Sequence, residues 1–392
     1  MFHARQVAAH SPFAVVYLYR PGDGGLDRVA IQLANHLHRR GLRVELWLAH
    51  LDGPLAGMID PALTVRRVCA PRWARRLSMI AQFLPLAAMV RRHRPDVVYS
   101  AGNQSNMLVA AATLGTQTRA VGRISNPIVR PGQQGLSAWA RKTRFRAIAR
   151  ACSMTIVMGE TDRQLLAEEG PLGGRDVRLM PRPTVTRLME QACNDRGTAC
   201  CPQRPAQLLM VGRLAPQKDQ ATALAALAQL RNRDWRLRIV GQGPLRAQLE
   251  AQCARLGLSD RVEFLGFVDC PHRMASLFAE ADLLLQPSCW EGLAGTMIEA
   301  LGCGAGVVAT DCTRNIHPLL AAAGQHPPVP VGDVDRFARA IEWALAHPAP
   351  PEQLAQAVRE HGLDRALDTY MRALMTVGVR ELPVGVALQA FP

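Results

Sequence analysis

The chain has 392 residues, 48% of them hydrophobic and 20% charged, which indicates a globular protein with more than one folded core. Its 46 basic residues against 32 acidic ones give a net charge of +14, and the first 190 residues alone carry +15, with 27 basic and 12 acidic residues. A one-sided basic surface attracts a polyanion, but aromatic residues make up only 5% and no helix-turn-helix or zinc-finger pattern is present, which argues against nucleic acid.

Strands and helices alternate along the first half of the chain. An apolar strand at residues 13–18 (FAVVYL) leads through a glycine-containing loop to a helix, because apolar residues from Leu26 to Leu37 recur at spacings of three and four before Gly41. Further strands are predicted at residues 44–48, 97–100, 119–124, 155–158 and 177–180, with helices ending near Gly115, at 139–150 and opening at Thr161. Strict alternation predicts a parallel sheet with helices on both faces.

The pattern breaks between residues 181 and 205, where Pro, Gly, Asn and Asp cluster, and then resumes. The break predicts a linker with a short helix at residues 185–193. Later strands are predicted at residues 207–211, 236–240, 262–265, 283–285 and 306–310, and helices at 220–230, 245–256, 274–279, 296–301, 334–346 and 352–375. The fold class is therefore α/β, with two doubly wound Rossmann-like domains whose shared cleft is the expected active site. We place the domains at residues 1–183 and 206–350, the linker at 184–205, and a C-terminal helix and tail at 351–392 that cross back toward the first domain.

A basic and apolar stretch lies at residues 72–94 (RWARRLSMIAQFLPLAAMVRRHR). Its apolar part, residues 77–90, is too short to span a bilayer and contains Pro85. The stretch fits a helix lying along a membrane surface, and it fits equally well an ordinary helix packed on its sheet with solvated arginines at its ends. Together with the basic first half, it makes an anionic membrane surface a candidate partner.

Cysteine usage and the start of the chain bear on the compartment. The ten cysteines form no Cys-x-x-Cys pair and no Cys/His cluster at zinc spacing, which indicates reduced, packed thiols. Residues 1–11 contain His and Gln where a signal peptide needs an apolar core. We therefore expect a cytoplasmic protein.

Two glutamates stand in the stretch ADLLLQPSCWEGLAGTMIEALGC of the second half. Glu291 falls in the loop after a predicted strand, and Glu299 falls in the first turns of the helix that follows. Ligands of open α/β sheets bind at such strand ends, so the two carboxylates are candidates for binding the hydroxyls of a sugar-like ligand. For each glutamate alone, a favourable interaction with the helix dipole is the alternative explanation.

Arg213, Lys218 and Gly241 follow other strand ends of the same predicted sheet. Arg213 and Lys218 lie five residues apart in VGRLAPQKD, where a guanidinium fork and a mobile ammonium group suit a diphosphate. Lys142 is the only other lysine in the chain, so a lysine-rich composition does not explain a lysine at residue 218. The alternative is a solvated charge in a turn. Gly241 lies in VGQGP, a glycine-containing loop of the kind that lets a backbone approach a phosphate.

These stretches resemble a known family. VGRLAPQKD, IVGQGPLRAQLE, RVEFLGF and PSCWEGLAGTMIEALGCGAGVVATD follow the order and spacing of the second domain of family-4 retaining glycosyltransferases with the type-B (GT-B) fold. The resemblance covers most of residues 206–346, and in the first half it rests on GGLDRVAIQLANHL after the first strand. The chain looks most like bacterial transferases of polysaccharide, lipopolysaccharide or lipid-linked sugar assembly.

The resemblance implies roles for individual residues. Arg213 and Lys218 match positions that bind the donor diphosphate, Glu299 matches one that bonds the ribose, and Glu291 matches one that contacts the donor sugar. The other substrate-binding candidates are Gly24, Gly25, Gly241, Gly292, Leu293, Ala294, Gly295 and Thr296. The resemblance also implies that no metal ion and no cofactor is needed, and that the leaving phosphate takes the acceptor's proton in a front-face reaction.

Two segments depart from the family pattern. Relatives carry a His in an Arg-Glu-His-Asn tetrad after the fifth strand, where this chain has Ser125, flanked by Arg123 and Asn126. We take Ser125 as the catalytic candidate there, with Arg123 and Asn126 as substrate-binding candidates. Relatives also read Gly-Pro-x-Glu-Ile-Leu where this chain reads NIHPLL from Asn315, so the acid is absent. His317 is a candidate substitute, but a surface or packing role is the commoner one for such a histidine.

The sequence therefore predicts a metal-independent retaining glycosyltransferase with Glu291, Arg213, Lys218 and Ser125 as its catalytic residues. It would move a sugar from a nucleoside-diphosphate sugar, such as a UDP-sugar, to a glycan or lipid-linked acceptor in cell-surface polysaccharide or glycolipid synthesis. The alternative is a catalytically degenerate GT-B protein that binds a sugar nucleotide or acts as a scaffold. The expected location is the cytoplasm, peripheral on the cytoplasmic face of the inner membrane, and the oligomeric state stays open.

Overall fold

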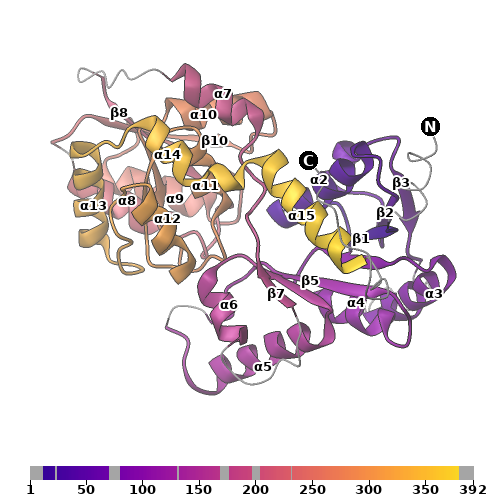
Figure 1. Cartoon of the computed structure of the whole chain (residues 1–392). Helices are drawn as coiled ribbons and strands as arrows, with labels where there is room; N and C mark the ends of the chain where they lie inside the picture. Colours follow the sequence, from indigo (N-terminus) through magenta and orange to yellow (C-terminus); the bar gives the residue numbers. More distant parts are fainter. Residues whose placement is uncertain are drawn as a thin grey trace. The chain divides into compact units, whose positions relative to one another are not determined.

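The computed structural model describes residues 12–22, 24–69, 80–129, 132–167, 176–196, 204–230 and 232–378 (Figure 1). Contacts divide these residues into two units. The first runs to Ser125, resumes over Ala140–Met180 and resumes again from Leu367, and the second comprises Asn126–Trp139 and Pro181–Ala366. Each unit contains one parallel sheet with interleaved helices, which confirms the predicted α/β class with two Rossmann-like domains.

The first unit is built on a seven-stranded sheet with the strand order β3-β2-β1-β4-β5-β6-β7. Its strands are β1 (Ala14–Leu18), β2 (Val44–Leu48), β3 (Thr64–Arg67), β4 (Val97–Ser100), β5 (Arg119–Ile124), β6 (Met154–Val157) and β7 (Asp176–Leu179). The helices of this part of the chain are α2 (Gly25–Arg39), α3 (Phe83–His93), α4 (Asn106–Thr113), α5 (Gly135–Ala151) and α6 (Glu160–Ala167). All five residues of β1 are buried, because β1 pairs with β2 on one side and β4 on the other.

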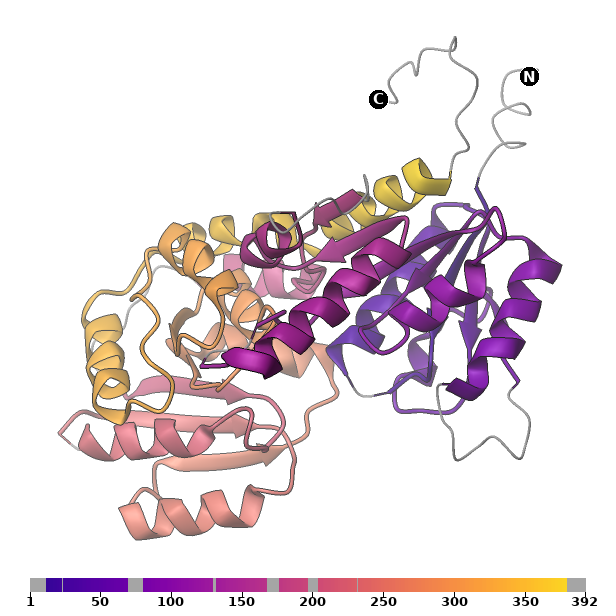
Figure 2. The same cartoon turned by 90° about the horizontal axis from the view of Figure 1, so that it is seen from below.

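The second unit is built on a five-stranded sheet with the order β10-β9-β8-β11-β12. Its strands are β8 (Ala206–Val211), β9 (Trp235–Val240), β10 (Val262–Gly266), β11 (Leu283–Gln286) and β12 (Gly306–Ala309). Its helices are α7 (Arg187–Asp195), α8 (Gln220–Gln229), α9 (Arg246–Leu256), α10 (Pro271–Glu280), α11 (Gly295–Gly302), α12 (His317–Ala322), α13 (Val334–Ala346) and α14 (Pro351–Ala357), and Figure 2 shows them from a second direction.

The core of the second unit explains why these segments form strands. Leu237 and Ile239, two residues apart, point to the same face of β9, where they pack in one buried cluster with Leu224 of α8 and Phe337 of α13. The strand order reverses at β8, since β9 and β10 lie on one side of it and β11 and β12 on the other. The carboxyl ends of β8 and β11 therefore form the topological switch point, the usual ligand site of such sheets.

The structure differs from the sequence prediction in several elements. Strand β3 was not predicted, because its sequence TVRR lies at the sheet edge and is largely exposed. Helix α12 was not predicted either. The single helix predicted at residues 352–375 is two helices, α14 and α15 (Leu363–Gly378), separated by a 3-10 turn at Arg359–His361 and by Gly362. Asp23, residues 72–79 of the basic stretch and the tail at residues 379–392 lie outside the described residues.

The unit boundaries also lie elsewhere than the predicted domain boundaries. The segment predicted as a linker from residue 184 joins the second unit, since α7 packs on α10, α11 and α14. The last helix, α15, carries the chain back into the first unit, where Asp368 accepts a 2.7 Å hydrogen bond from Arg40 and lies 2.8 Å from Nε2 of His36. The passage between units therefore falls at residue 366 instead of 350.

Glycines let two strand-end loops of the second unit touch backbone to backbone. The N–H of Gly212 donates to Val240 at 2.9 Å, and the N–H of Leu214 donates to Gln242 at 2.9 Å. A Cβ on Gly241 would lie 2.0 Å from the carbonyl oxygen of Gly212, and Gly241 has a φ of +141°. The contact that requires glycine at residue 241 is thus the neighbouring loop, which holds the β8 and β9 loops in register.

The substitution Gly241→Ala tests this contact. We expect it to lower the free energy of unfolding of the second unit by about 3 kcal/mol, because it adds a clash with backbone to an unfavourable φ. Gly257→Ala is the matched control: its φ is +68° and a Cβ there would meet nothing within 4 Å, so it should cost about 1 kcal/mol. Denaturant unfolding of both variants checks this, and equal losses would contradict the backbone clash.

Candidate active site

Lys218 and Glu291 meet at the switch point of the second sheet. Nζ of Lys218 lies 2.6 Å from Oε1 of Glu291, and the two side chains are 20% and 12% exposed. Lys218 belongs to the loop after β8 and Glu291 to the loop after β11. The β8 and β11 loops are also tied through Gln217, whose carbonyl accepts from the N–H of Cys289 at 2.8 Å and whose side chain donates to the carbonyl of Trp290 at 2.9 Å. The structure thus brings together a cation and an acid that the sequence predicted separately.

A chain of buried polar groups supports the Glu291 carboxylate. Thr296 donates to Oε1 of Gln286 at 2.9 Å, Gln286 donates to Oγ of Ser288 at 2.6 Å, and Ser288 donates to Oε1 of Glu291 at 3.1 Å. Gln286 is 3% exposed and Ser288 is fully buried. Sequence reasoning missed both residues, although a Gln and a Ser ending an otherwise apolar strand were the available signal. These bonds fix Oε1 of the carboxylate, the same oxygen that Lys218 contacts.

Glu299 lies on α11 beside the segment at residues 181–186. The hydroxyl of Thr184 donates a short hydrogen bond to Oε1 of Glu299. A Cβ on Gly302, nearly one turn further along α11, would lie 2.8 Å from the methyl groups of Val185. Glu299 is therefore held by a side chain from a segment that the sequence presented as a linker, and Thr184 was missed because that segment has no periodicity.

The remaining candidates of the second unit surround these groups. Gly292, Leu293 and Ala294 are buried in the loop that connects Glu291 to α11, and Gly295 and Thr296 begin that helix. Arg213 follows β8 and is exposed, with its backbone carbonyl accepting from Gln220 at 3.1 Å. All of them lie at the carboxyl edge of one sheet.

Two buried thiols stand near the acids. Burial raises the pKa of Cys312 to about 12, and the Glu291 carboxylate adds to the shift. Burial also raises the pKa of Cys303, with Glu299 as the next cause. Both thiols stay protonated at neutral pH, so neither supplies a nucleophile at this edge of the sheet.

The site residues predicted in the first unit differ in exposure and in local structure. Gly24 caps the N-terminus of α2 with extended backbone, and Gly25 is the first residue of that helix. Ser125 is half-buried after β5, and its N–H donates to the side chain of Asn103 at 3.0 Å. Asn126, the next residue, is exposed and belongs to the second unit.

Arg123 is buried in the first unit. Its side chain is 2% exposed, and one guanidinium nitrogen lies 3.3 Å from the sulfur of Met158. Tyr99 and Tyr370 of the same unit interact with the guanidinium. The expectation that Arg123 binds substrate therefore conflicts with its burial, which points to a role in the core of the first unit.

His317 pairs with an acid other than Glu291 and Glu299. Its Nε2 lies 2.8 Å from Oδ1 of Asp311, and both side chains are 46% exposed. This pair explains the histidine as a surface residue. Among the described residues, no three His, Cys, Asp or Glu side chains are grouped where they could bind a metal ion.

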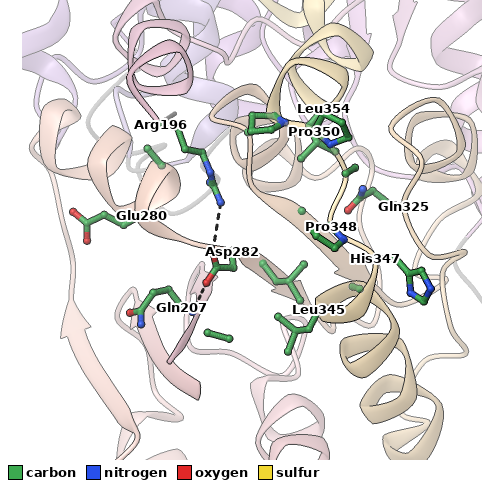
Figure 3. A pocket seen from close by; sticks show the side chains of 18 of the residues that line it. Arg196, Gln207, Glu280, Asp282, Gln325, Leu345, His347, Pro348, Pro350 and Leu354 are labelled. Carbon is green, nitrogen blue, oxygen red and sulfur yellow. Dashed lines mark hydrogen bonds and ion pairs between the residues drawn. The ribbon is translucent and has the colours of Figure 1, made fainter. Parts of the chain in front are cut away.

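The large hollow of the second unit in Figure 3 lies at the opposite edge of the sheet. It encloses about 1190 Å³ and is lined by residues at the amino ends of the strands, such as Ala206, Asp282 and Gly306. Arg196 and Arg204 both pair with Asp282 there, at 3.7 and 2.7 Å. Strand polarity decides between the two edges, so the carboxyl edge with Lys218 and Glu291 is the candidate site.

Comparisons with known proteins fit this geometry. The family model of glycosyl transferases group 1 matches residues 200–361, and the model of glycosyltransferase family 4 matches residues 23–187. Together the two models cover most of the chain, which belongs to the glycosyltransferases that they describe. Within the described part of the chain, no helix combines the length and apolar character needed to cross a membrane.

Individual relatives match the chain at low to moderate sequence identity. The chain is 31% identical over 280 residues to the 2-deoxystreptamine glucosyltransferase of Streptomyces kanamyceticus, covering 65% of this chain and 66% of that protein, just under two thirds of its length. It is 24% identical to the N-acetylgalactosamine-N,N'-diacetylbacillosaminyl-diphospho-undecaprenol 4-alpha-N-acetylgalactosaminyltransferase of Campylobacter jejuni, over 76% of this chain and 80% of that one. The HepE protein of Anabaena, solved with UDP, shares the fold with a TM-score of 0.72 at 19% identity, over 93% of this chain and 100% of that one.

His361 provides a pH test of the contacts beside α11. Nδ1 of its ring accepts the N–H of Arg182 at 2.9 Å, and its carbonyl accepts the N–H of Thr184 at 3.1 Å. Burial lowers the pKa of His361 to about 4 from its ordinary value of 6.5. The unfolded chain therefore binds a proton that the folded chain does not, between those two pH values.

We expect the free energy of unfolding to fall by up to about 3 kcal/mol more in the wild type than in His361→Asn as the pH drops from 6.5 to about 4. Above pH 6.5 the contribution is complete and independent of pH. Denaturant titrations of both proteins across this window measure the difference. Parallel pH profiles for the two proteins would show that His361 is protonated in the folded state.

Proposed function

We propose that this chain is a retaining glycosyltransferase that works without a metal ion and moves a sugar from a nucleoside-diphosphate sugar to a glycan or lipid-linked acceptor. The main structural support for this proposal is the Lys218–Glu291 pair at the switch point of the second sheet. An acid and a cation held 2.6 Å apart offer an acceptor for sugar hydroxyls beside a charge for phosphate oxygens. Family membership supports the same assignment.

Each group has a distinct task in this proposal. Arg213 and Lys218 stabilise the negative charge that builds on the departing diphosphate. Glu291 accepts hydrogen bonds from hydroxyls of the donor sugar, and Glu299 accepts from the ribose. The bond between the sugar's anomeric carbon and the diphosphate oxygen breaks. The acceptor oxygen forms its bond on the same face, and its proton passes to the leaving diphosphate.

Substitution of the pair tests this function. We expect Lys218→Met and Glu291→Gln each to lower kcat/KM for the donor by about 100-fold. The first removes a charge that stabilises the departing diphosphate, and the second removes the carboxylate that accepts from the donor sugar's hydroxyls. Purified protein is assayed with UDP- and GDP-sugars against glycan and polyprenyl-diphosphate acceptors. Arg255→Met, an exposed position on α9, serves as the control and should keep full activity. Absence of donor binding and of transfer in the wild type would refute the proposal.

Ser125 supports a second candidate, a GT-B protein that binds a sugar nucleotide without transferring the sugar. The residue stands where the resembling family has a histidine, and its half-buried position beside Asn103 supplies no acid or base. Donor binding with neither transfer nor slow donor hydrolysis, across a broad acceptor panel, would favour this candidate. A Ser125→His variant that gains activity would favour it further.

We also propose that the protein acts at the cytoplasmic face of an anionic membrane. The first 190 residues carry a net charge of +15, and helix α3 exposes Leu84, at 74%, near one end and Arg91 and Arg92 near the other. An apolar side chain followed by arginines suits the boundary of an anionic bilayer. The free cysteines of the described chain fit a reducing compartment.

Vesicle binding tests the membrane proposal. We expect the protein to sediment with phosphatidylglycerol vesicles, to release as salt is raised, and to bind phosphatidylcholine vesicles far less, because the attraction is electrostatic. Leu84→Ser combined with Arg92→Glu should weaken binding by at least about 10-fold, because the lost arginine alone accounts for roughly 1 kcal/mol and the new carboxylate and the lost apolar group add to it. Arg255→Glu makes an equal charge change on α9 and should have little effect. Equal binding to both lipids would contradict the proposal.

A further inference from the structure

Two consecutive carbonyl groups after Glu291 are held by side chains from distant parts of the chain. Nδ2 of Asn315 donates to the carbonyl oxygen of Gly292 at 3.0 Å. A guanidinium nitrogen of Arg182 donates a short hydrogen bond to the carbonyl oxygen of Leu293. Both contacts lie within the second unit, in the loop that connects Glu291 to α11.

Fixing these carbonyls also fixes the N–H groups that share their peptide planes. In a planar trans peptide, the N–H points opposite to the C=O, so the N–H groups of Leu293 and Ala294 are aimed away from Asn315 and Arg182. The two residues are 4% and 2% exposed. Their N–H groups donate to no group in the described part of the chain. Buried N–H groups are nearly always paired, so this pair of donors points to a ligand.

Arg182 is positioned firmly for this contact. Its own N–H is bound to His361 at 2.9 Å, and its guanidinium lies against the first residue of α11. A Cβ on Gly295 would lie 2.9 Å from Nε of Arg182, so the guanidinium occupies the space that a side chain at residue 295 would need. A cation at the N-terminus of a helix adds to the positive end of the helix dipole. An anion beside residues 293–295 would be stabilised by both.

Asn315 comes from the segment that departs from the resembling family. It lies in the 3-10 turn η4 (Arg314–Ile316), where the hydroxyl of Thr313 also contacts the carbonyl of Gly292, at 3.4 Å. An amide can donate to a carbonyl, and a carboxylate cannot. The contact to the Gly292 carbonyl therefore requires a donor at residue 315, which the Asn315 amide supplies.

We propose that Arg182 and Asn315 are positioning residues of the donor site, which hold the Gly292 and Leu293 carbonyls so that the next two N–H groups bind the donor's diphosphate. The inference rests on the proposed function and assigns two residues to it. Neither side chain needs to touch the donor. Their effect is to keep two backbone donors in place before the donor binds, so that no ordering cost falls on binding.

The test compares nucleoside diphosphates with the corresponding nucleosides. Dissociation constants of UDP, uridine, GDP and guanosine are measured for the full chain, for Arg182→Met and for Asn315→Asp. We expect each variant to bind the preferred diphosphate about 10-fold more weakly, since one backbone donor is released in each. Nucleoside binding should stay unchanged, because the nucleoside lacks the diphosphate. In the transfer assay the donor KM should rise by the same factor, with little change in kcat.

Conservative and remote variants serve as controls. Arg182→Lys keeps one hydrogen-bond donor and should recover part of the lost affinity. If Arg182→Met does not fold, Arg182→Lys replaces it as the test variant. Arg255→Met should leave all four dissociation constants unchanged. Equal weakening of nucleoside and diphosphate would assign Arg182 and Asn315 a purely structural role, and unchanged diphosphate binding would show that the carbonyls need no support. A wild type that binds neither diphosphate would overturn this inference together with the proposed function.

Discussion

The ion pair between Lys218 and Glu291 joins the loops after two adjacent strands, 73 residues apart in the sequence, where the strand order of the second sheet reverses. Both groups are largely removed from water, so deleting one leaves a partly buried charge unpaired. Gly292 follows Glu291 directly, and the ion pair therefore also determines where the loop before α11 begins. The contact acts together with the Gln217 bonds to Cys289 and Trp290, which tie the same two loops.

Much of this geometry was predictable from the sequence, because it depends on topology. Short apolar runs bounded by glycine or proline predicted every strand of the second sheet, and parallel strands place their carboxyl ends at one edge. Lys218 and Glu291 were found as residues that follow strand ends, without any knowledge of their distance. Gly241 was found for a different reason from the one that the structure shows, since its neighbour is the carbonyl of Gly212.

The residues that escaped prediction act across long sequence separations from segments without periodicity. Thr184 lies 115 residues from Glu299, in a stretch whose prolines indicate only a linker. Arg123 shows the converse: its place in a motif predicted a ligand contact, whereas the burial of its guanidinium depends on Tyr370 of the last helix. The local sequence pattern predicts where strands lie and how long loops are. It predicts neither the partner of a polar side chain nor the burial of that side chain.

The loop between Glu291 and α11 is also connected to two of the four places where the chain passes from one unit to the other, after Met180 and after Ala366. The segments beside these passages bind each other, because the N–H of Val185 donates to the carbonyl of His361 at 3.2 Å and the N–H of Leu363 donates to Val185 at 2.7 Å. The first of them also supplies the hydroxyl on Glu299 and the guanidinium on the Leu293 carbonyl. A change in the backbone of residues 182–185 therefore alters hydrogen bonds of Leu293 and Glu299, which couples the chain crossings to the geometry of the candidate site.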